Sequence, residues 1–181
     1  MRAADGSFGP VRIEVRIGDI AAQADVDAVV NAANADLAPG SGVAGAIHRA
    51  AGPGLHAECR ALAPIETGQC VLTGGHDLPA AHVIHCLGPV YGRDEPADEL
   101  LADCYRGALL LADEQGLSSV AFPAISTGVF GYPLRDAAMV ALEAVRDVAD
   151  ELTHVRVVRF VLFEEIGLSV FRDALRRLTA G

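Results

Sequence analysis

Short apolar segments alternate with helix-like segments along most of this chain. The strand-like segments are residues 11–17, 26–31, 70–75, 82–88, 119–125 and 155–163. The helix-like segments are residues 42–51, 55–62, 98–115, 134–152 and 168–178. Several of the strand-like segments are apolar at nearly every position, which is typical of strands buried between two layers of helices. The alternation therefore predicts an α/β fold with three layers, α/β/α, around a central sheet that is mixed and mostly parallel.

Glycine and proline residues mark the ends of several of these elements. Residues 52–54, Gly-Pro-Gly, separate the first two helices. Gly116 follows the third helix, where glycine commonly ends a helix, and Pro133 precedes the fourth. Segment 11–17 alternates between apolar and charged residues, which predicts an edge strand or a half-buried strand.

The start of the chain differs in composition from the rest. Residues 1–10 are polar and rich in glycine, without the apolar stretch of a signal peptide. We therefore expect a flexible N-terminal arm, followed by a single domain over residues 11–181. No apolar run is long enough to span a bilayer. These features favour a cytoplasmic monomer that does not bind membranes.

The charged residues disfavour several kinds of site. The chain has 181 residues and a formal net charge of −10, which disfavours nucleic-acid binding through a basic surface. All 14 basic residues are arginine, so the chain has neither a phosphate-loop lysine nor a lysine nucleophile. A bound phosphate would therefore be held by backbone N–H groups or by arginine.

The cysteines and histidines do not form a metal-binding pattern. The four cysteines are widely spaced and include no CxxC pair, which predicts reduced thiols in the protein interior. His82 and His85 are close together, but no cysteine or acidic residue stands at a suitable spacing from them. We expect no metal ion and no cofactor.

Two glycine-rich loops follow predicted strands and lead into predicted helices. They are residues 39–45 and residues 126–131. Ligands of α/β sheets lie beyond the carboxyl ends of the strands, and a helix N-terminus offers free N–H groups to an anion. Two such loops facing one crevice would hold two linked phosphates. The alternative is that each loop only makes a tight turn, since neither matches a dinucleotide or P-loop motif.

Five motifs occur in a fixed order along the chain. They are GDI (18–20), VNAAN (30–34), GSGVAGAIHRAAGP (40–53), LPAAHVIHCLGPVY (78–91) and ISTGVFGYP (125–133). In order and spacing this set resembles the macrodomain family, and in particular its MacroD-like ADP-ribosylhydrolase branch. The resemblance extends from about residue 11 to residue 178. It implies a macrodomain fold with a cleft for ADP-ribose.

The resemblance assigns roles to individual residues at the two ends of the ligand. Asp19 corresponds to the acceptor of the adenine amino group, with the Ile20 backbone beside it; a turn or N-cap aspartate is the alternative. Asn34 corresponds to the asparagine that hydrogen-bonds the distal ribose, and an Asx turn is the alternative. Phe163 is placed like the aromatic residue that stacks on adenine, with a core phenylalanine as the alternative.

The same resemblance assigns the two glycine loops to the diphosphate. The first-loop residues are Ser41, Gly42 and Val43. The second-loop residues are Ser126, Thr127, Gly128, Val129 and Phe130. Either Phe130 or Tyr132 would then cover the ribose.

The sequence departs from the family pattern at Ala44. MacroD-like hydrolases carry an aspartate there, which orients or activates the water that attacks the distal ribose. A general base typically contributes roughly 10²–10⁴-fold, so its loss would slow the reaction without abolishing it. A phosphate oxygen of the ligand would then hold the water while Asn34 positions the ribose. Asp36, Asp94 and Glu95 are loop carboxylates that could substitute, although a solvated surface role suits each of them.

Two histidines also fall within the matched motifs. His48 follows the first glycine loop on the same predicted helix, and His85 lies in a predicted strand. Both positions are mainly structural in the family. We expect each ring to be packed and hydrogen-bonded and not to act as a base.

These features lead to one functional hypothesis and two rivals. We expect a bacterial-type ADP-ribosylhydrolase that binds ADP-ribose and releases it from acidic residues of ADP-ribosylated proteins. Ala44 favours the first rival, a reader that binds ADP-ribose without turnover. The second rival, a deacetylase of O-acetyl-ADP-ribose, would use the same cleft. The absence of lysine excludes the macrodomain route through a lysine adduct.

Overall fold

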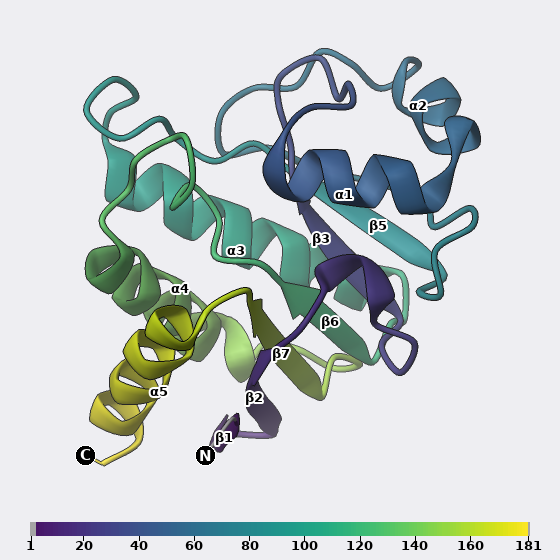
Figure 1. Ribbon diagram of the computed structural model, residues 1–181. Coiled ribbons are helices and arrows are strands. Elements are labelled where there is room, and N and C mark those ends of the chain that lie inside the picture. The colour runs from purple at the N-terminus through teal and green to yellow at the C-terminus, as the bar shows by residue number, and fades with distance from the viewer. Residues whose placement is uncertain (1–2, 181) are drawn as a thin grey trace.

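The computed structural model of the protein describes residues 3–180. Its centre is a seven-stranded sheet with the order β1-β2-β7-β6-β3-β5-β4 (Figure 1). The strands are β1 (Ala3–Phe8), β2 (Val11–Ile17), β3 (Ala28–Ala32), β4 (Cys70–Gly74), β5 (His82–Cys86), β6 (Ser119–Phe122) and β7 (Val157–Leu162). The pairs β1–β2 and β4–β5 at the two edges are antiparallel, and the pairs between them are parallel. The sheet is therefore mixed and mostly parallel, as predicted.

Helices cover both faces of this sheet (Figure 1). They are η1 (Ile20–Ala22, a 3-10 helix), α1 (Gly42–Ala51), α2 (Pro53–Cys59), α3 (Ala97–Glu114), α4 (Leu134–Ala149) and α5 (Glu165–Thr179). One face packs against α1 and α2, and the other against α3, α4 and α5. Neighbouring residues of β5 show the division. Val83 belongs to the apolar cluster that includes α1 and α2, and Ile84 belongs to the cluster that includes α3, α4 and α5. The predicted three-layer α/β/α arrangement is confirmed.

The N-terminal segment corrects one prediction, because residues 3–8 are not a flexible arm. They form β1, which pairs antiparallel with β2. Phe8 pairs with Val11 across a two-residue turn in which Gly9 takes φ +53°, a conformation that glycine adopts without steric penalty. Since β2 also pairs with β7, it lies inside the sheet and is not an edge strand. Residues 1–2 of the predicted arm lie outside the described residues.

The other predicted elements are present, with ends that differ by a few residues. The strand predicted over residues 119–125 ends at Phe122, because Pro123 has no N–H to donate to a neighbouring strand. The second helix begins at Pro53, whose fixed φ suits the first turn of a helix. The last helix begins earlier than predicted, and the short helix η1 was not predicted.

The register of β3 and β6 brings the two glycine loops to one edge of the sheet. These strands are parallel neighbours, with Val29 opposite Ala121. The chain leaves β3 at Ala32 and β6 at Phe122. Both strands therefore deliver their following loops to the same side of the molecule, where ligands of α/β sheets bind.

Candidate functional site

The first glycine loop leads directly into α1. Ser41 is the N-cap residue, but its side chain makes no capping hydrogen bond. Gly42 takes φ +59°, and a Cβ atom added there would meet nothing within 4 Å. Within residues 3–180, no acceptor binds the backbone N–H groups of Gly42, Val43 or Ala44. These free N–H groups and the positive end of the helix dipole make the loop a candidate anion site.

The second glycine loop is closed by internal hydrogen bonds and holds one strained residue. The backbone N–H of Tyr132 donates to the carbonyl of Ser126 at 2.9 Å. The hydroxyl of Thr127 donates to the carbonyl of Ala124 at 2.8 Å. Ser126 takes φ +69°, which is uncommon for a residue with a side chain. Its buried hydroxyl has no hydrogen-bond partner in the described part of the chain. Such strain persists where surrounding contacts hold the backbone in place.

The tip of the second loop presents free backbone groups. The N–H groups of Gly128, Val129 and Phe130 have no acceptor among the described residues. Gly128 has open space where a Cβ atom would stand, and Val129 is 89% exposed. A ligand can therefore approach this stretch of backbone closely.

Tyr105 of α3 supports the second loop from behind. Its side chain is fully buried, at 0% exposure. The hydroxyl donates to the carbonyl of Pro123 at 3.2 Å and accepts from the N–H of Ile125 at 3.1 Å. Burial raises the pKa of this hydroxyl, so it stays protonated and both hydrogen bonds persist at neutral pH. Tyr105 thus fixes the segment that ends β6 and starts the loop.

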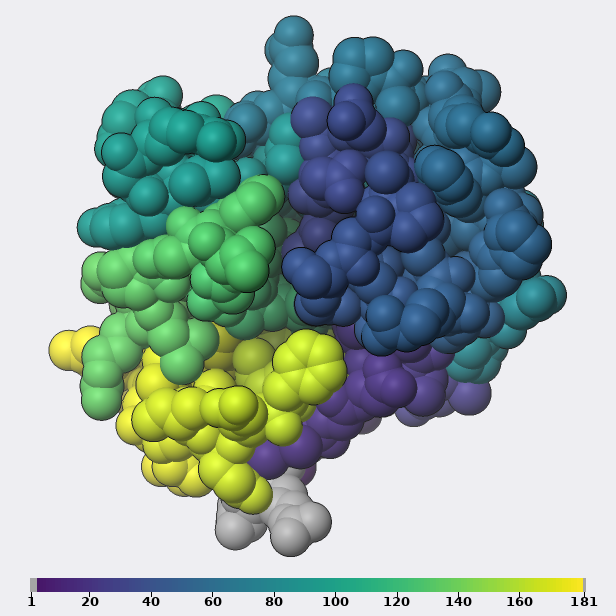
Figure 2. Space-filling view, turned by 45° about the horizontal axis from the view of Figure 1, so that its top comes forward, coloured from purple at the N-terminus to yellow at the C-terminus, as the bar shows by residue number. Residues whose placement is uncertain are grey.

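The two glycine loops face each other across a hollow, seen in Figure 2 between the blue and green segments. We call it the inter-loop cavity; its volume is about 120 Å³. Its lining residues are Ala32, Ser41, Val43, Ala124, Ser126, Gly128, Val129 and Phe130. No charged side chain lines it, so an anion there would meet backbone N–H groups and helix dipoles.

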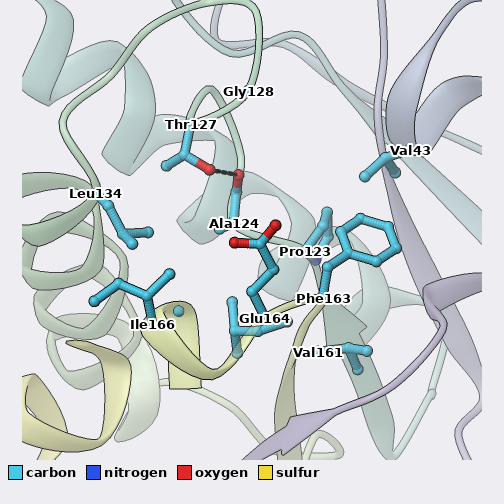
Figure 3. Close-up of a pocket in the computed structure, with 12 residues that line it drawn as sticks. Val43, Pro123, Ala124, Thr127, Gly128, Leu134, Val161, Phe163, Glu164 and Ile166 are labelled. Carbon is cyan, nitrogen blue, oxygen red and sulfur yellow. Dashed lines mark hydrogen bonds between the residues drawn. The ribbon is translucent and has the colours of Figure 1, made fainter. Parts of the chain in front are cut away.

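An apolar cavity adjoins the first one at the end of β7 (Figure 3). We call it the Phe163 cavity; its volume is about 340 Å³. Its lining residues are Val43, Pro123, Ala124, Thr127, Gly128, Leu134, Val161, Leu162, Phe163, Glu164, Ile166 and Gly167. Val43, Ala124 and Gly128 also line the inter-loop cavity, so the two are continuous. Phe163 is 62% exposed, which rules out the alternative of a core phenylalanine.

A more polar cavity lies on the other side of the inter-loop cavity, and Phe130 lines both. We call it the Asn34 cavity; its volume is about 450 Å³. Its other lining residues are Asn34, Ala35, Ile65, Glu66, Thr67, Leu87, Gly88, Val90, Arg93 and Asp94. The three cavities form one cleft with an apolar end, a middle surrounded by N–H groups, and a polar end.

The Asn34 side chain closes the loop that carries it. Its Nδ2 donates to the carbonyl of Ala38 at 2.9 Å, and its Oδ1 accepts from the N–H of Ala38 at 3.0 Å. These bonds reach four residues along the chain and not the two of an Asx turn, so the side chain does stabilise its own loop, but in a wider turn than the predicted alternative. Each amide atom keeps one further hydrogen-bonding position, so Asn34 remains able to bind a hydroxyl group in the cavity it lines.

Several predicted ligand residues lie outside this cleft. Asp19 lines none of the three cavities; it is exposed and caps η1, where its Oδ1 accepts from the N–H of Ala21 at 2.9 Å. Ile20 is buried in the apolar core. Tyr132 is 5% exposed and faces a different pocket, with its ring 4.9 Å from that of Tyr91. Of the two aromatic residues expected to cover the ribose, Phe130 is therefore the one at the cleft.

Ala44 lies close to Asn34 across Gly40. A Cβ atom built on Gly40 would stand 3.4 Å from Nδ2 of Asn34 and 3.9 Å from Cβ of Ala44. Ala44 itself is 5% exposed, in the first turn of α1. Ala44 and the Asn34 amide therefore flank the same glycine, although Ala44 lines none of the three cavities.

The three loop carboxylates considered as substitutes occupy different places. Asp94 lines the Asn34 cavity, where it accepts from the N–H of Val90 at 2.8 Å. That hydrogen bond and the neighbouring Arg93 hold the pKa of Asp94 below its usual value, so it is a carboxylate at neutral pH. Glu95 and Asp36 do not line that cavity, and both are exposed.

The two histidines of the matched motifs are both buried, with different surroundings. The Nδ1 atom of His85 lies 3.0 Å from Asn31 and its Nε2 atom 2.9 Å from the hydroxyl of Thr73. Burial lowers its pKa to about 3, so the ring is neutral and structural, as predicted. His48 is also buried, but neither ring nitrogen has a hydrogen-bond partner within residues 3–180. The predicted hydrogen bonding of His48 is therefore not found.

Sequence reasoning missed one residue that lines this cleft and one that supports it from behind. Glu164 follows Phe163, and Figure 3 shows its carboxylate pointing into the Phe163 cavity. Its position before a predicted helix gave no sign that it faces a ligand site. Tyr105 fits the apolar pattern of its predicted helix, and that pattern does not show that the hydroxyl supports a distant loop.

The described residues show neither a metal site nor a membrane span. Between residues 3 and 180, no group of three or more histidine, cysteine or acidic side chains is placed to hold a metal ion. No helix in the same range is long and apolar enough to cross a membrane. The four cysteines are free thiols.

Comparison with known proteins agrees with this fold and cleft. Residues 30–141 match the family model described as Macro domain. A macro domain-containing protein of Chlorobaculum tepidum is 48% identical over 151 residues, covering 83% of this chain and 88% of that protein. This chain therefore belongs to the macro domain family.

One relative and one solved structure bear on the cleft. The ADP-ribose glycohydrolase MACROD2 of Xenopus laevis is 46% identical over 161 residues, which cover 87% of this chain and 38% of that protein. A mutant Oceanobacillus iheyensis macrodomain solved with ADPR superposes with a TM-score of 0.94 at 37% identity. That match covers 99% of this chain and 100% of the other, so the overall fold is the macrodomain fold.

Proposed function

We propose that this chain binds ADP-ribose along the cleft formed by the three cavities. The observation that carries the proposal is the pair of loops whose free N–H groups line one uncharged hollow. The diphosphate lies in the inter-loop cavity, the adenine against Phe163, and the distal ribose in the Asn34 cavity. The similar macrodomain solved with ADPR, the usual abbreviation of ADP-ribose, supports this choice of ligand.

The adenine end offers two carboxylates for the exocyclic amino group. Glu164 points into the Phe163 cavity (Figure 3). Asp19 has one oxygen that is not used in capping η1, but it stands outside the cavity lining. A carboxylate is a good acceptor for an amino group. We assign the larger share of adenine recognition to Glu164, so Glu164→Gln weakens binding more than Asp19→Asn.

The reaction we assign to this site is hydrolysis of ADP-ribose linked to acidic side chains of proteins. Water adds at the anomeric carbon of the distal ribose, and the bond from that carbon to the carboxyl oxygen breaks. The electron pair of that bond stays with the leaving carboxylate, and one proton from the water passes to solvent. The similarity to an ADP-ribose glycohydrolase supports this reaction class.

The residues at the polar end can position the substrate for this reaction, but they include no strong base. Asn34 aligns the ribose, and Ala44, on the other side of Gly40, supplies no proton acceptor. A phosphate oxygen of the ligand holds the water, and the ionised Asp94 offers a second acceptor in the same cavity. Positioning contributes to rate without proton transfer, so we expect turnover that is slow and measurable.

Ala44 favours a second candidate function, a reader that binds ADP-ribose without turnover. Alanine provides no proton acceptor at the buried start of α1. A deacetylase of O-acetyl-ADP-ribose would use the same cleft, and no residue of the site distinguishes it.

A single-turnover assay separates hydrolase from reader. The protein is mixed at stoichiometric concentration with a protein carrying mono-ADP-ribose on glutamate, and released ADP-ribose is followed over hours. Slow release that is further slowed by Asn34→Ala supports hydrolysis. If no ADP-ribose is released while the modified protein still binds, the result supports the reader function. Release of acetate from O-acetyl-ADP-ribose is measured in parallel.

A further inference from the structure

A second pocket lies beside the polar end of the cleft, at the start of α3. We call it the acidic pocket; its volume is about 350 Å³. Its walls include the rings of Tyr91 and Tyr132 and the carboxylates of Glu95 and Asp98. The two rings lie 4.9 Å apart at 55°. None of the functions discussed so far uses this pocket.

The carboxylates of this pocket have no cationic partner in the described part of the chain. One oxygen of Glu95 accepts from the N–H of Ala97 at 3.3 Å, and one oxygen of Asp98 accepts from the N–H of Glu99 at 3.0 Å. Neither carboxylate forms an ion pair within residues 3–180. Arg93, the arginine nearest in sequence, pairs with Asp94 instead. The negative charge of the pocket is therefore uncompensated.

Tyr132 supplies a polar atom at the base of the pocket. Tyr132 is only 5% exposed, and its hydroxyl forms no hydrogen bond among the described residues, although it is not one of the fully enclosed polar atoms. Burial and the neighbouring charges of Asp98 and Asp136 raise the pKa of this hydroxyl. Tyr132 lines the pocket, and a tyrosine hydroxyl can accept from an N–H donor.

Aromatic rings and carboxylates together favour one class of ligand. A cation is attracted by the face of a tyrosine ring and by an unpaired carboxylate. A metal ion is disfavoured, because the described residues contain no group of three metal-ligating side chains in one place. A guanidinium group fits better than a compact ammonium, because it stacks on aromatic rings and pairs with carboxylates through two N–H groups.

The position of the pocket connects it with the cleft. The segment that begins at Val90 separates the two: Val90, Arg93 and Asp94 line the Asn34 cavity, whereas Tyr91 and Glu95 line the acidic pocket. The N–H of Tyr91 also donates to the carbonyl of a cleft residue, Phe130, at 2.9 Å. The teal and green segments that contain these residues lie side by side in Figure 1. A chain attached to a ribose in the Asn34 cavity would leave the cleft beside this pocket.

We propose that the acidic pocket binds an arginine side chain of the ADP-ribosylated protein, close in sequence to the modified residue. This inference rests on the proposed binding of ADP-ribose in the cleft. The pocket thereby adds a preference for basic sequences around the modification, which the ADP-ribose cleft by itself does not provide.

The test compares two peptides that carry ADP-ribose on the same glutamate. One has arginines on both sides of the glutamate, and the other has glutamines at those positions. Kd is measured for both peptides and for free ADP-ribose. With the native protein we expect the arginine peptide to bind about tenfold more tightly than the glutamine peptide. Raising the salt concentration should narrow this gap.

Two double variants identify the pocket as the cause. Glu95→Gln with Asp98→Asn should remove the gap while the Kd for free ADP-ribose stays within about twofold. The control is Glu99→Gln with Asp103→Asn, which changes the net charge equally at two positions of α3 outside the pocket, and the gap should persist. Equal Kd values for the two peptides, or a difference in Kd that persists in the pocket variant, would overturn this inference and leave the proposed binding of ADP-ribose in place. No binding of free ADP-ribose by the native protein would overturn the proposed function as well.

Discussion

The hydroxyl of Tyr105 donates to the carbonyl of Pro123 at 3.2 Å, which ties the centre of α3 to the segment between β6 and the second glycine loop. The same oxygen accepts a hydrogen bond from the backbone N–H of Ile125. A residue that lines none of the three cavities therefore supports the backbone that the proposed diphosphate meets.

Tyr105→Phe should weaken ADP-ribose binding severalfold and lower stability by about 1–2 kcal/mol, because two buried backbone groups lose their partner. That loss corresponds to roughly 2–8 °C in Tm for a chain of this size. Calorimetry and thermal denaturation measure the two effects. Tyr91→Phe is the matched control, since it removes the hydroxyl of a half-exposed tyrosine, and it should change Tm little. An unchanged Kd in Tyr105→Phe would show that the loop does not need this support.

Gly128→Glu should abolish ADP-ribose binding and leave the fold intact. A side chain at Gly128 meets no atom of the protein within 4 Å, but it would occupy the space of the diphosphate and repel its charge. Titration calorimetry and circular dichroism measure binding and folding. Ala57→Glu on the exposed face of α2 is the control of equal charge and should bind normally. Gly42 is less suitable for this test, because its φ of +59° makes any side chain there strained. Wild-type affinity in folded Gly128→Glu would exclude the second loop as a phosphate site.

Ala44→Asp should accelerate release of ADP-ribose from modified protein, and Asn34→Ala should slow it. An aspartate at Ala44 would start in the first turn of α1, across Gly40 from Asn34, and would be stabilised by the N-terminus of that helix. A general base typically raises the reaction rate by roughly 10²–10⁴-fold, and imperfect alignment would make the gain smaller. Asn34→Ala also removes both hydrogen bonds to Ala38, so its Tm should fall by a few degrees.

Single-turnover rates and separate Kd measurements distinguish chemistry from binding in these variants. Asn34→Ala should lower the rate more than the affinity. Equal rates in the native protein and in Asn34→Ala would mean that other residues align the ribose. No acceleration in Ala44→Asp would mean that this position does not face the reacting carbon.

The loops and layers could be predicted from the sequence because each depends on a local pattern. Parallel strands followed by glycine-rich segments indicate where a ligand meets the backbone, and the structure brings segments 39–45 and 126–131 together around one cavity. Phe130 and Tyr132 show the limit of this reasoning. Both are aromatic residues in one loop, and only tertiary packing decides that Phe130 lines the cleft while Tyr132 turns to the acidic pocket.

Charged residues were the hardest to place from sequence. Glu164 and Asp94 line the cleft, whereas Asp19 caps a short helix outside its lining. A carboxylate in a loop has the same sequence signature whether it faces solvent, a helix end or a cavity. The first strand was missed for a different reason, since its short alternation became meaningful only when paired with β2 through the turn at Gly9.

Asp113 should give the protein a distinct acid sensitivity. Although desolvation opposes it, hydrogen bonds from the N–H groups of Val155, His154 and Thr153 lower the pKa of Asp113 to about 2. Its unfolded pKa is about 3.9, so its stabilising contribution is complete above about pH 4 and is lost as pH falls toward 2. Asp113→Asn should therefore lower Tm at neutral pH, and the difference from the native protein should shrink between pH 4 and pH 2. The exposed Asp147→Asn is the control. A Tm difference that is constant over this range would contradict the assignment.

The central claim is that the two glycine loops hold the diphosphate of ADP-ribose, and titration calorimetry with ADP-ribose and with AMP tests it most directly. In the proposed arrangement, ADP-ribose would place phosphates against both loops and a ribose in the Asn34 cavity, whereas AMP would reach only the Phe163 cavity and part of the inter-loop cavity. The account predicts a saturable binding isotherm for ADP-ribose, with a lower Kd than that for AMP. No heat of binding at high ADP-ribose concentration, or AMP binding as tightly as ADP-ribose, would contradict it.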